Sequence, residues 1–248
     1  MGYWPVVLNI LKNSDVVILL ADARVPEITK NKEILKKAEI LKKKLILVFS
    51  KTDLIGKNDI LELKKNNPGS LLISGKNKKS VDGLKHYLER LAEENYRTSL
   101  RVGIVGYPNV GKSTLINMLV PGANVKVSKV SGTTKKTEWI RLGRLRIMDS
   151  PGVIPSGDSS EVVGIASAKD PHKMKNPERV AMRIIAFLNK KNKKILEKFY
   201  NIESTDDYDT FLKIGKKKGF FLKGGEIDEF RTAIRIVDDW QGGKIKLG

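Results

Sequence analysis

The chain has 248 residues, of which 40% are hydrophobic and 30% charged, so it can bury a substantial core and is typical of a globular protein. A net charge of +19 favours a polyanionic partner such as nucleic acid; a solubilising lysine coat, or the lysine-rich usage of heat-adapted proteins, is the alternative. The absence of cysteine excludes disulfides, thiolate metal sites and a cysteine nucleophile. The chain shows no signal-peptide pattern and no apolar run of membrane-spanning length, so we expect a soluble protein of the cytoplasm that does not enter membranes.

Six short apolar runs predict the strands of one sheet. They cover residues 15–22, 45–49, 71–73, 101–105, 137–142 and 144–149. Apolar residues at helical spacing predict helices over 30–43, near 57–65, over 81–91 and from Ser113 onward. Strands that alternate with helices are typical of an α/β fold with a doubly wound, mostly parallel sheet, and we predict six strands in it.

The polar segment Ser50-Lys51-Thr52-Asp53 follows the second predicted strand. A carboxylate at Asp53 matches the N1–H and N2–H₂ donors of guanine, which adenine lacks, and the stem of Lys51 can lie along a purine plane. Ligands of open α/β sheets bind at the carboxyl ends of the strands, where this segment is expected. The alternative is that the segment is only the polar end of a strand.

Residues 106–113, Gly-Tyr-Pro-Asn-Val-Gly-Lys-Ser, stand between a predicted strand and a predicted helix. This is the pattern of a phosphate-binding P-loop, and it makes the sheet one of the P-loop NTPase type. Backbone N–H groups and the positive helix end cradle phosphates there. The side chain of Lys112 is expected to reach the β- and γ-phosphates, and Ser113 to coordinate Mg²⁺. The predicted phosphate-binding residues are Asn109, Val110, Gly111, Lys112, Ser113 and Thr114.

The segment Asp149-Ser150-Pro151-Gly152 ends the last predicted strand. Asp149 is placed to hold the Mg²⁺ shell, and the N–H of Gly152 can sense a γ-phosphate. Thr133 or Thr134, in the polar stretch before it, could close a hydroxyl onto the metal, and we assign that role to Thr134. We therefore predict Lys112, Thr134 and Gly152 as the catalytic residues.

Beyond the proline-rich stretch 170–177 the pattern is helical throughout. We predict a domain of residues 1–170 and a small, basic, all-α domain of residues 171–248. Clustered cations beside aromatic residues suit RNA, because phosphates bind lysine and bases stack on rings. The candidate RNA contacts are Lys216, Lys217, Lys218 and Lys223, next to Phe220 and Phe221. A merely solvated basic turn is the alternative.

Together these segments resemble the five signature motifs of translation-factor-class GTPases, but in the order four, five, one, two, three. Motif four is residues 50–53, motif five is Ser74-Gly75-Lys76, motif one is 106–113, motif two surrounds Thr133-Thr134, and motif three is 149–152. This order is the hallmark of the circularly permuted GTPases of ribosome assembly. Residues 22–26 and 223–226 are also similar to that family.

The resemblance implies a slow GTPase that binds GTP and GDP with Mg²⁺. It further implies ribosomal RNA or a precursor large subunit as a nucleotide-dependent partner, with the free protein a monomer. The residues that it places around the base are Ser50, Lys51, Asp53, Ser74, Gly75 and Lys76. A regulatory GTPase with a protein partner and a small-molecule P-loop kinase are the alternatives.

Three positions refine this expectation. Asn109 matches the P-loop asparagine that similar GTPases use with K⁺ to stabilise transition-state charge; a turn-forming asparagine is the alternative. Val153 stands where signalling GTPases carry a water-orienting glutamine, so we expect slow hydrolysis, stimulated by K⁺ and by the ribosomal partner. Ser50 replaces the usual asparagine of motif four, which removes an amide that normally braces the P-loop.

Overall fold

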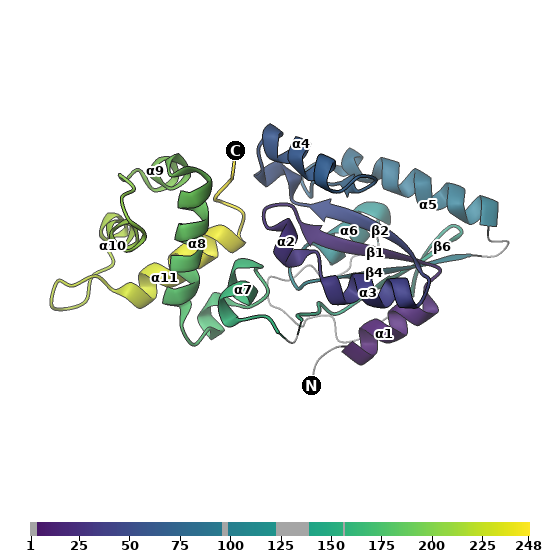
Figure 1. Ribbon diagram of the computed structural model, residues 1–248, viewed down its shortest axis with the longest axis horizontal. Helices are drawn as coiled ribbons and strands as arrows, with labels where there is room; N and C mark the ends of the chain where they lie inside the picture. Colours follow the sequence, from purple (N-terminus) through teal and green to yellow (C-terminus); the bar gives the residue numbers. More distant parts are fainter. Residues whose placement is uncertain (1–3, 96–98, 123–138, 156) are drawn as a thin grey trace. The chain divides into compact units, whose positions relative to one another are not determined.

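A computed structural model of the chain describes residues 4–95, 99–122, 139–155 and 157–248 (Figure 1). The chain forms two compact units, residues 1–157 and 158–248. Unit one contains a six-stranded sheet, and unit two is helical. The predicted fold class is therefore confirmed.

The sheet of unit one has the strand order β3-β2-β1-β4-β6-β5. All neighbouring strands are parallel except β5 and β6, which pair antiparallel. The central strand β1 is buried along its whole length, as expected of a strand covered on both faces. The strands are β1 (Val16–Asp22), β2 (Lys44–Ser50), β3 (Leu71–Leu72), β4 (Leu100–Gly106), β5 (Trp139–Leu142) and β6 (Leu145–Asp149).

Helices cover both faces of this sheet, with α1 and α3 on one side and α4 and α5 on the other (Figure 1). The helices of unit one are α1 (Trp4–Asn13), α2 (Pro26–Thr29), α3 (Lys32–Ile40), α4 (Lys57–Asn66), α5 (Asp82–Asn95) and α6 (Lys112–Leu119), with short 3₁₀ turns η1 (Thr52–Leu54) and η2 (Lys78–Val81). Helix α1 was not predicted, although Val7, Ile10 and Leu11 are buried at helical spacing.

One apolar cluster joins α1 and α3 to the sheet. Its buried members include Ile10 of α1, Ile34 of α3 and Val105 of β4. Helix α1 can pack this closely because position 103 is glycine: a Cβ there would lie 2.6 Å from Ile10 Cγ2. The cluster also contains Val153, which follows motif three.

Unit two consists of α7 (Ser160–Ile165), the 3₁₀ turn η3 (Pro171–Lys173), α8 (Pro177–Asn192), α9 (Lys194–Tyr200), α10 (Asp207–Lys218) and α11 (Glu229–Gln241). Its core surrounds Trp240, which is fully buried and donates a hydrogen bond from Nε1 to Ile165 O at 2.9 Å. A Cβ on Gly164 would lie 2.4 Å from Val180 Cγ1, so α7 packs directly against α8. Residues 158–170 are part of this compact unit, whereas the sequence predicts a domain boundary after residue 170.

Candidate functional site

The predicted motifs follow strands that end at one edge of the sheet. Strand register places Asp22 beside Ser50, Leu20 beside Gly106, and Ile104 beside Asp149. This common edge is the carboxyl end of four parallel strands, where ligands of such sheets bind. The sequence segments that begin at Ser50, Gly106 and Asp149 therefore meet in space.

The P-loop leads from β4 into α6. Gly106 has φ +154°, and a Cβ there would lie 2.3 Å from Leu20 O, so only glycine fits. Asn109 and Gly111 also have positive φ, at +57° and +101°. These turns bring the N-terminal end of α6, which begins at Lys112, to the end of β4. Such a loop presents backbone N–H groups and a helix N-terminus to an anion.

Lys112 folds back over this loop. Its buried Nζ donates to Tyr107 O at 2.7 Å and to Gly106 O at 3.3 Å. Burial lowers the pKa of Lys112 to about 8, although the Asp149 carboxylate acts in the opposite direction. Among the described residues, the negative charge near this cation comes from Asp149 and from carbonyl dipoles, and a phosphate at the loop would add to it.

Ser113 and Asp149 form the candidate Mg²⁺ site. Ser113 Oγ donates to Asp149 Oδ2 at 2.8 Å, and the carboxylate is buried. A hydroxyl and a carboxylate are the hard oxygen ligands that Mg²⁺ prefers, and Mg²⁺ takes its other ligands from phosphates and water. The described residues contain no group of three or more His, Cys, Asp or Glu that could hold a metal ion. Thr133 and Thr134 lie outside the described residues.

Motif three packs directly on the P-loop. Val153 N donates to Gly106 O at 3.1 Å, and a Cβ on Gly152 would lie 2.4 Å from Pro108 N. The position of Gly152 thus requires glycine. The side chain of Val153 is 2% exposed and belongs to the apolar cluster beneath α1 and α3. Val153 therefore serves the core and has no group that could orient a water molecule.

Motifs four and five are held together around Asp53. Ser74 Oγ donates to Asp53 Oδ1 at 2.8 Å, and Lys76 Nζ lies 3.6 Å from Oδ2. Thr52 Oγ1 donates to Ile73 O at 2.9 Å, which joins η1 to the end of β3. Each carboxylate oxygen keeps a second lone pair, so Asp53 retains acceptor capacity for a base.

Gly75 and Ser50 connect these motifs to the P-loop. A Cβ on Gly75 would lie 3.5 Å from Thr114 Cγ2 in the first turn of α6. The Ser50 hydroxyl lies 2.6 Å from Val110 O and 3.0 Å from Ala21 O, so it bridges the P-loop and β1. The serine hydroxyl therefore makes a contact with the P-loop, in the place of the contact expected to be absent without the asparagine amide. Backbone carbonyls placed close to β2 allow this substitution.

Lys51 is anchored by a buried acid that the sequence alone did not assign a role. Its Nζ lies 2.7 Å from Asp22 Oδ2, and Arg24 Nη2 lies 2.8 Å from the same oxygen. Burial by itself would raise the pKa of Asp22, but the charges of Lys51 and Arg24 hold that pKa far below its usual value. The similarity of residues 22–26 to the family was the one signal that could have found this anchor.

The candidate RNA contacts lie in unit two. Lys216, Lys217 and Lys218 are exposed in the last turn of α10, and Lys223 is exposed in the turn that precedes α11. Phe221 beside that turn is 47% exposed. Lysines in the last turn of a helix also interact favourably with the helix dipole. The position of these lysines by itself therefore does not distinguish an RNA contact from a solvated basic turn.

Comparison with known proteins agrees with this geometry. Residues 7–157 match the RsgA GTPase family model, and residues 101–214 match the model of 50S ribosome-binding GTPases. The chain belongs to the RsgA GTPase family. Motifs four, five, one and three run in the permuted order along one sheet edge, so the expected circularly permuted GTPase fold is confirmed.

Relatives of this RsgA-family chain are longer than it is. An uncharacterized GTP-binding protein of Methanocaldococcus jannaschii is 36% identical over 97% of this chain and 65% of that protein. Nucleolar GTP-binding protein 2 of Saccharomyces cerevisiae is 32% identical over 98% of this chain and 52% of that protein. GNP-bound YlqF from T. maritima has the same fold, with a TM-score of 0.64 and 22% identity over 98% of this chain and 95% of that chain. Among the described residues, no helix is both long and apolar enough to cross a membrane.

Proposed function

We propose that this protein is a GTPase that assists ribosome assembly by binding ribosomal RNA or a precursor large subunit in a nucleotide-dependent way. The observation that carries the proposal is the arrangement of Asp53, Lys112, Ser113 and Asp149 at one sheet edge. Names of the relatives add support, because they include nucleolar GTP-binding proteins, and one matching family model is that of 50S ribosome-binding GTPases. The proposal includes a cytoplasmic location and a monomeric free protein.

Different residues of the site bind the guanine base, the phosphates and the metal ion. Asp53, steadied by Ser74, accepts hydrogen bonds from N1–H and N2–H₂ of guanine. Lys112 and the P-loop N–H groups bind the β- and γ-phosphates, and Gly152 N–H contacts the γ-phosphate. Ser113 and Asp149 would hold Mg²⁺, and Thr134 would add a hydroxyl; the ion neutralises charge on the phosphate oxygens.

Co-sedimentation with ribosomal subunits tests the proposed function. Large subunits or their precursors should carry the protein down more strongly with a non-hydrolysable GTP analogue than with GDP. Motif three lies directly before the end of unit one, so a γ-phosphate sensor is followed in the chain by the helical unit. Equal co-sedimentation in both nucleotide states, or none at all, would remove ribosome assembly from the proposal.

We expect GTP hydrolysis to be slow in Na⁺ buffer and faster in K⁺. Val153 offers no water-positioning group, and a K⁺ ion at Asn109 would supply positive charge to the transition state. Steady-state phosphate release in equimolar NaCl and KCl measures the effect. Asn109→Ala should abolish the K⁺ response, whereas Asn58→Ala, on exposed α4, should keep it. Equal rates in the two salts would exclude a K⁺ site.

The lysines of α10 are expected to bind RNA phosphates. Log affinity falls as log salt concentration rises, and each lost phosphate contact makes this negative slope shallower by about 0.7–0.9. The Lys216/Lys217/Lys218→Ala variant should therefore have a slope that is shallower by about 2–3. Binding to large-subunit ribosomal RNA across a salt series measures the slope. Lys190/Lys193/Lys194→Ala removes the same charge from exposed positions between α8 and α9 and serves as the control. An unchanged slope in the α10 variant would assign its lysines to a solvated surface.

A further inference from the structure

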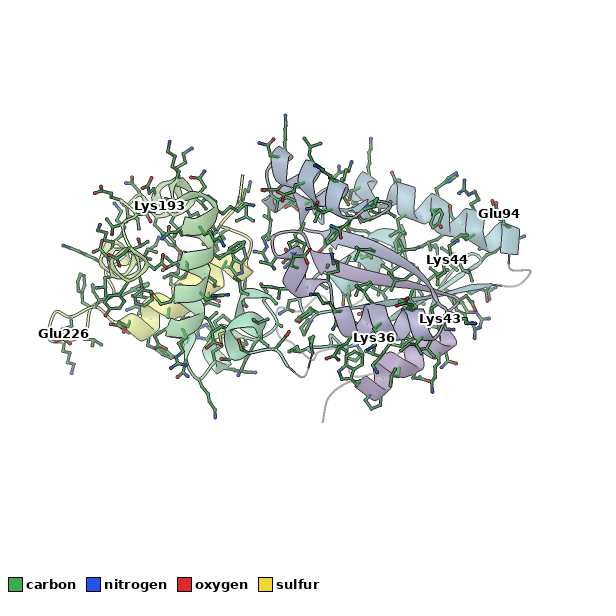
Figure 2. The ribbon with its side chains drawn as sticks, viewed as in Figure 1. Lys36, Lys43, Lys44, Glu94, Lys193 and Glu226 are labelled. Carbon is green, nitrogen blue, oxygen red and sulfur yellow. The ribbon has the colours of Figure 1, made fainter. Side chains whose placement is uncertain are left out.

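A second basic surface lies on unit one, away from the nucleotide site. Residues 30–44 contain seven lysines and two glutamates. They form α3, the turn after it and the first residue of β2, and Figure 2 shows Lys36, Lys43 and Lys44 along this path. Four of the lysines are exposed, and we call three of them, Lys36, Lys42 and Lys44, the α3–β2 lysines; the fourth is Lys32, the first residue of α3.

The α3–β2 lysines have no partners that would neutralise them. Within the described chain, none of the three forms an ion pair with a carboxylate. Other surface helices of unit one carry less net positive charge, although the lysines of α4 also form no ion pair among the described residues. In α5, Arg90 lies 3.6 Å from Glu94, and α4 carries Asp59 and Glu62 among its lysines. Clustered like charges repel one another, so this surface is suited to a polyanion.

The backbone at Lys42 strengthens the argument. Helix α3 ends in a Schellman motif, in which Lys42 N donates to Glu39 O at 2.8 Å and Lys43 N donates to Ala38 O at 2.9 Å. Lys42 occupies the left-handed position of this motif with φ +50°, where glycine or asparagine is favoured. The chain thus keeps a cation at a position where glycine would relieve backbone strain.

Two neighbouring lysines, Lys37 and Lys43, are half-buried and are not part of this surface. Lys43 Nζ donates to Lys12 O and to Ser14 O, each at 2.9 Å, and so satisfies carbonyls at the end of α1. Lys37 Nζ lies 5.4 Å from the ring centroid of Trp4. The α3–β2 lysines make no comparable backbone contact, although Lys44 Nζ lies 5.4 Å from the ring centroid of Tyr87.

This surface is separate from the nucleotide site. Lys44 begins β2 and Ser50 ends it, which puts the two about 20 Å apart at the usual rise of a strand. A small phosphate compound at the P-loop cannot reach both places. A long phosphate backbone fits a row of unpaired cations, because it offers one negative charge per nucleotide.

We propose that the α3–β2 lysines form a second RNA-docking surface, on the GTPase unit itself. The inference rests on the proposed function for its partner class. The inference goes beyond the proposed function because it assigns RNA contact to unit one, independently of the lysines of α10.

The test uses the full-length chain and large-subunit ribosomal RNA. In a triple variant, Lys36→Ala, Lys42→Gly and Lys44→Thr, the negative slope of log RNA affinity against log salt should become shallower by about 2–3, because three phosphate contacts are lost. GTP binding should not change, since none of these residues lies at the carboxyl edge of the sheet. Glycine at position 42 adopts the positive φ without strain. Alanine at position 36 favours a helix and threonine at position 44 favours a strand, so the variant is expected to fold.

The matched control is Lys57/Lys64/Lys65→Ala, which removes the same charge from exposed positions of α4. An unchanged slope in the α3–β2 variant, or an equal decrease in the control, would overturn the proposal. Poly-L-glutamate is measured in parallel; an equal loss of binding to it would point to an acidic protein as the partner and would also overturn it. If the wild-type chain binds no RNA at all, the proposed function fails together with the inference, whereas an unchanged slope with intact wild-type binding removes the inference alone.

Discussion

Replacing Lys112 with methionine is expected to weaken GTP binding by about 10²- to 10⁴-fold. In the proposed function the ammonium contacts two phosphates, and a hydrogen bond between charged groups contributes about 1.5–3 kcal/mol. Methionine keeps the apolar stem and removes the charge. Fluorescence competition with a labelled GTP analogue measures the loss.

The same change is expected to leave the nucleotide-free protein at least as stable as the wild type. Burial lowers the pKa of Lys112 from 10.5 to about 8, which amounts to about 3 kcal/mol of unfolding free energy lost at neutral pH. Below pH 8 the lysine is charged in both the folded and the unfolded state, and this cost is complete. It declines as the pH rises from 8 and vanishes above 10.5, where the lysine is neutral in both states. The stability advantage of Lys112→Met should therefore shrink between pH 8 and 10.5.

Lys57→Met, at an exposed position of α4, is the control for both measurements and should change neither GTP affinity nor stability. Chemical denaturation at a series of pH values gives the unfolding free energies. Near-normal GTP affinity in Lys112→Met would contradict the assignment of this residue to the phosphates. A fall in stability at pH 7 would instead show that the contacts of Nζ with the Tyr107 and Gly106 carbonyls outweigh the cost of burial.

Asp53→Asn is expected to weaken GTP binding by about 10- to 150-fold and to improve binding of xanthosine triphosphate. The change replaces an acceptor oxygen with an N–H₂ donor that would face the N2 amino group of guanine, and one charged hydrogen bond contributes about 1.5–3 kcal/mol. Xanthine carries an oxygen at that position and accepts the new donor. Ser74 can still donate to the remaining side-chain oxygen, so the loop between β2 and α4 should keep its structure.

Asp82→Asn, at the exposed start of α5, provides the matched control and should bind GTP as the wild type does. Competition by GTP, ATP and xanthosine triphosphate on all three proteins completes the experiment. If the wild type bound ATP as tightly as GTP, motif four would be only the polar end of a strand. A P-loop kinase would then become the better account of the site.

Much of the site could be predicted because it depends on local sequence. Gly106 and Gly111 are required by backbone angles within a single loop, and the strand before them and the helix after them have clear apolar patterns. The sequence separation between motifs four, five, one and three does not affect this, since each of these motifs follows its own strand. The placement of Asp53 near Ser74 was implied by the resemblance to the family, and the shared carboxyl edge of parallel strands accounts for it.

Contacts between distant segments could not be predicted in this way. The serine at position 50 was expected to leave the P-loop without a brace, but its hydroxyl reaches Val110 O because β1, β2 and the P-loop lie side by side. Helix α1 was missed, because its short apolar stripe becomes decisive only when β4 offers Gly103 for close packing. The sequence predicts a domain boundary after residue 170, whereas the compact units divide after residue 157; the close fit of Gly164 in α7 against Val180 is a contact that composition does not show.

The sequence by itself determined the fold class, the phosphate-binding loop and the permuted order of motifs, because each follows from local patterns and from the way strands alternate with helices. Only the tertiary structure decided that Val153 lies in the core, that Asp22 anchors Lys51, and that Ser50 bridges β1 and the P-loop. Burial and pairing depend on which surfaces meet once the chain is folded, and residues far apart in sequence carry no local signal of that meeting.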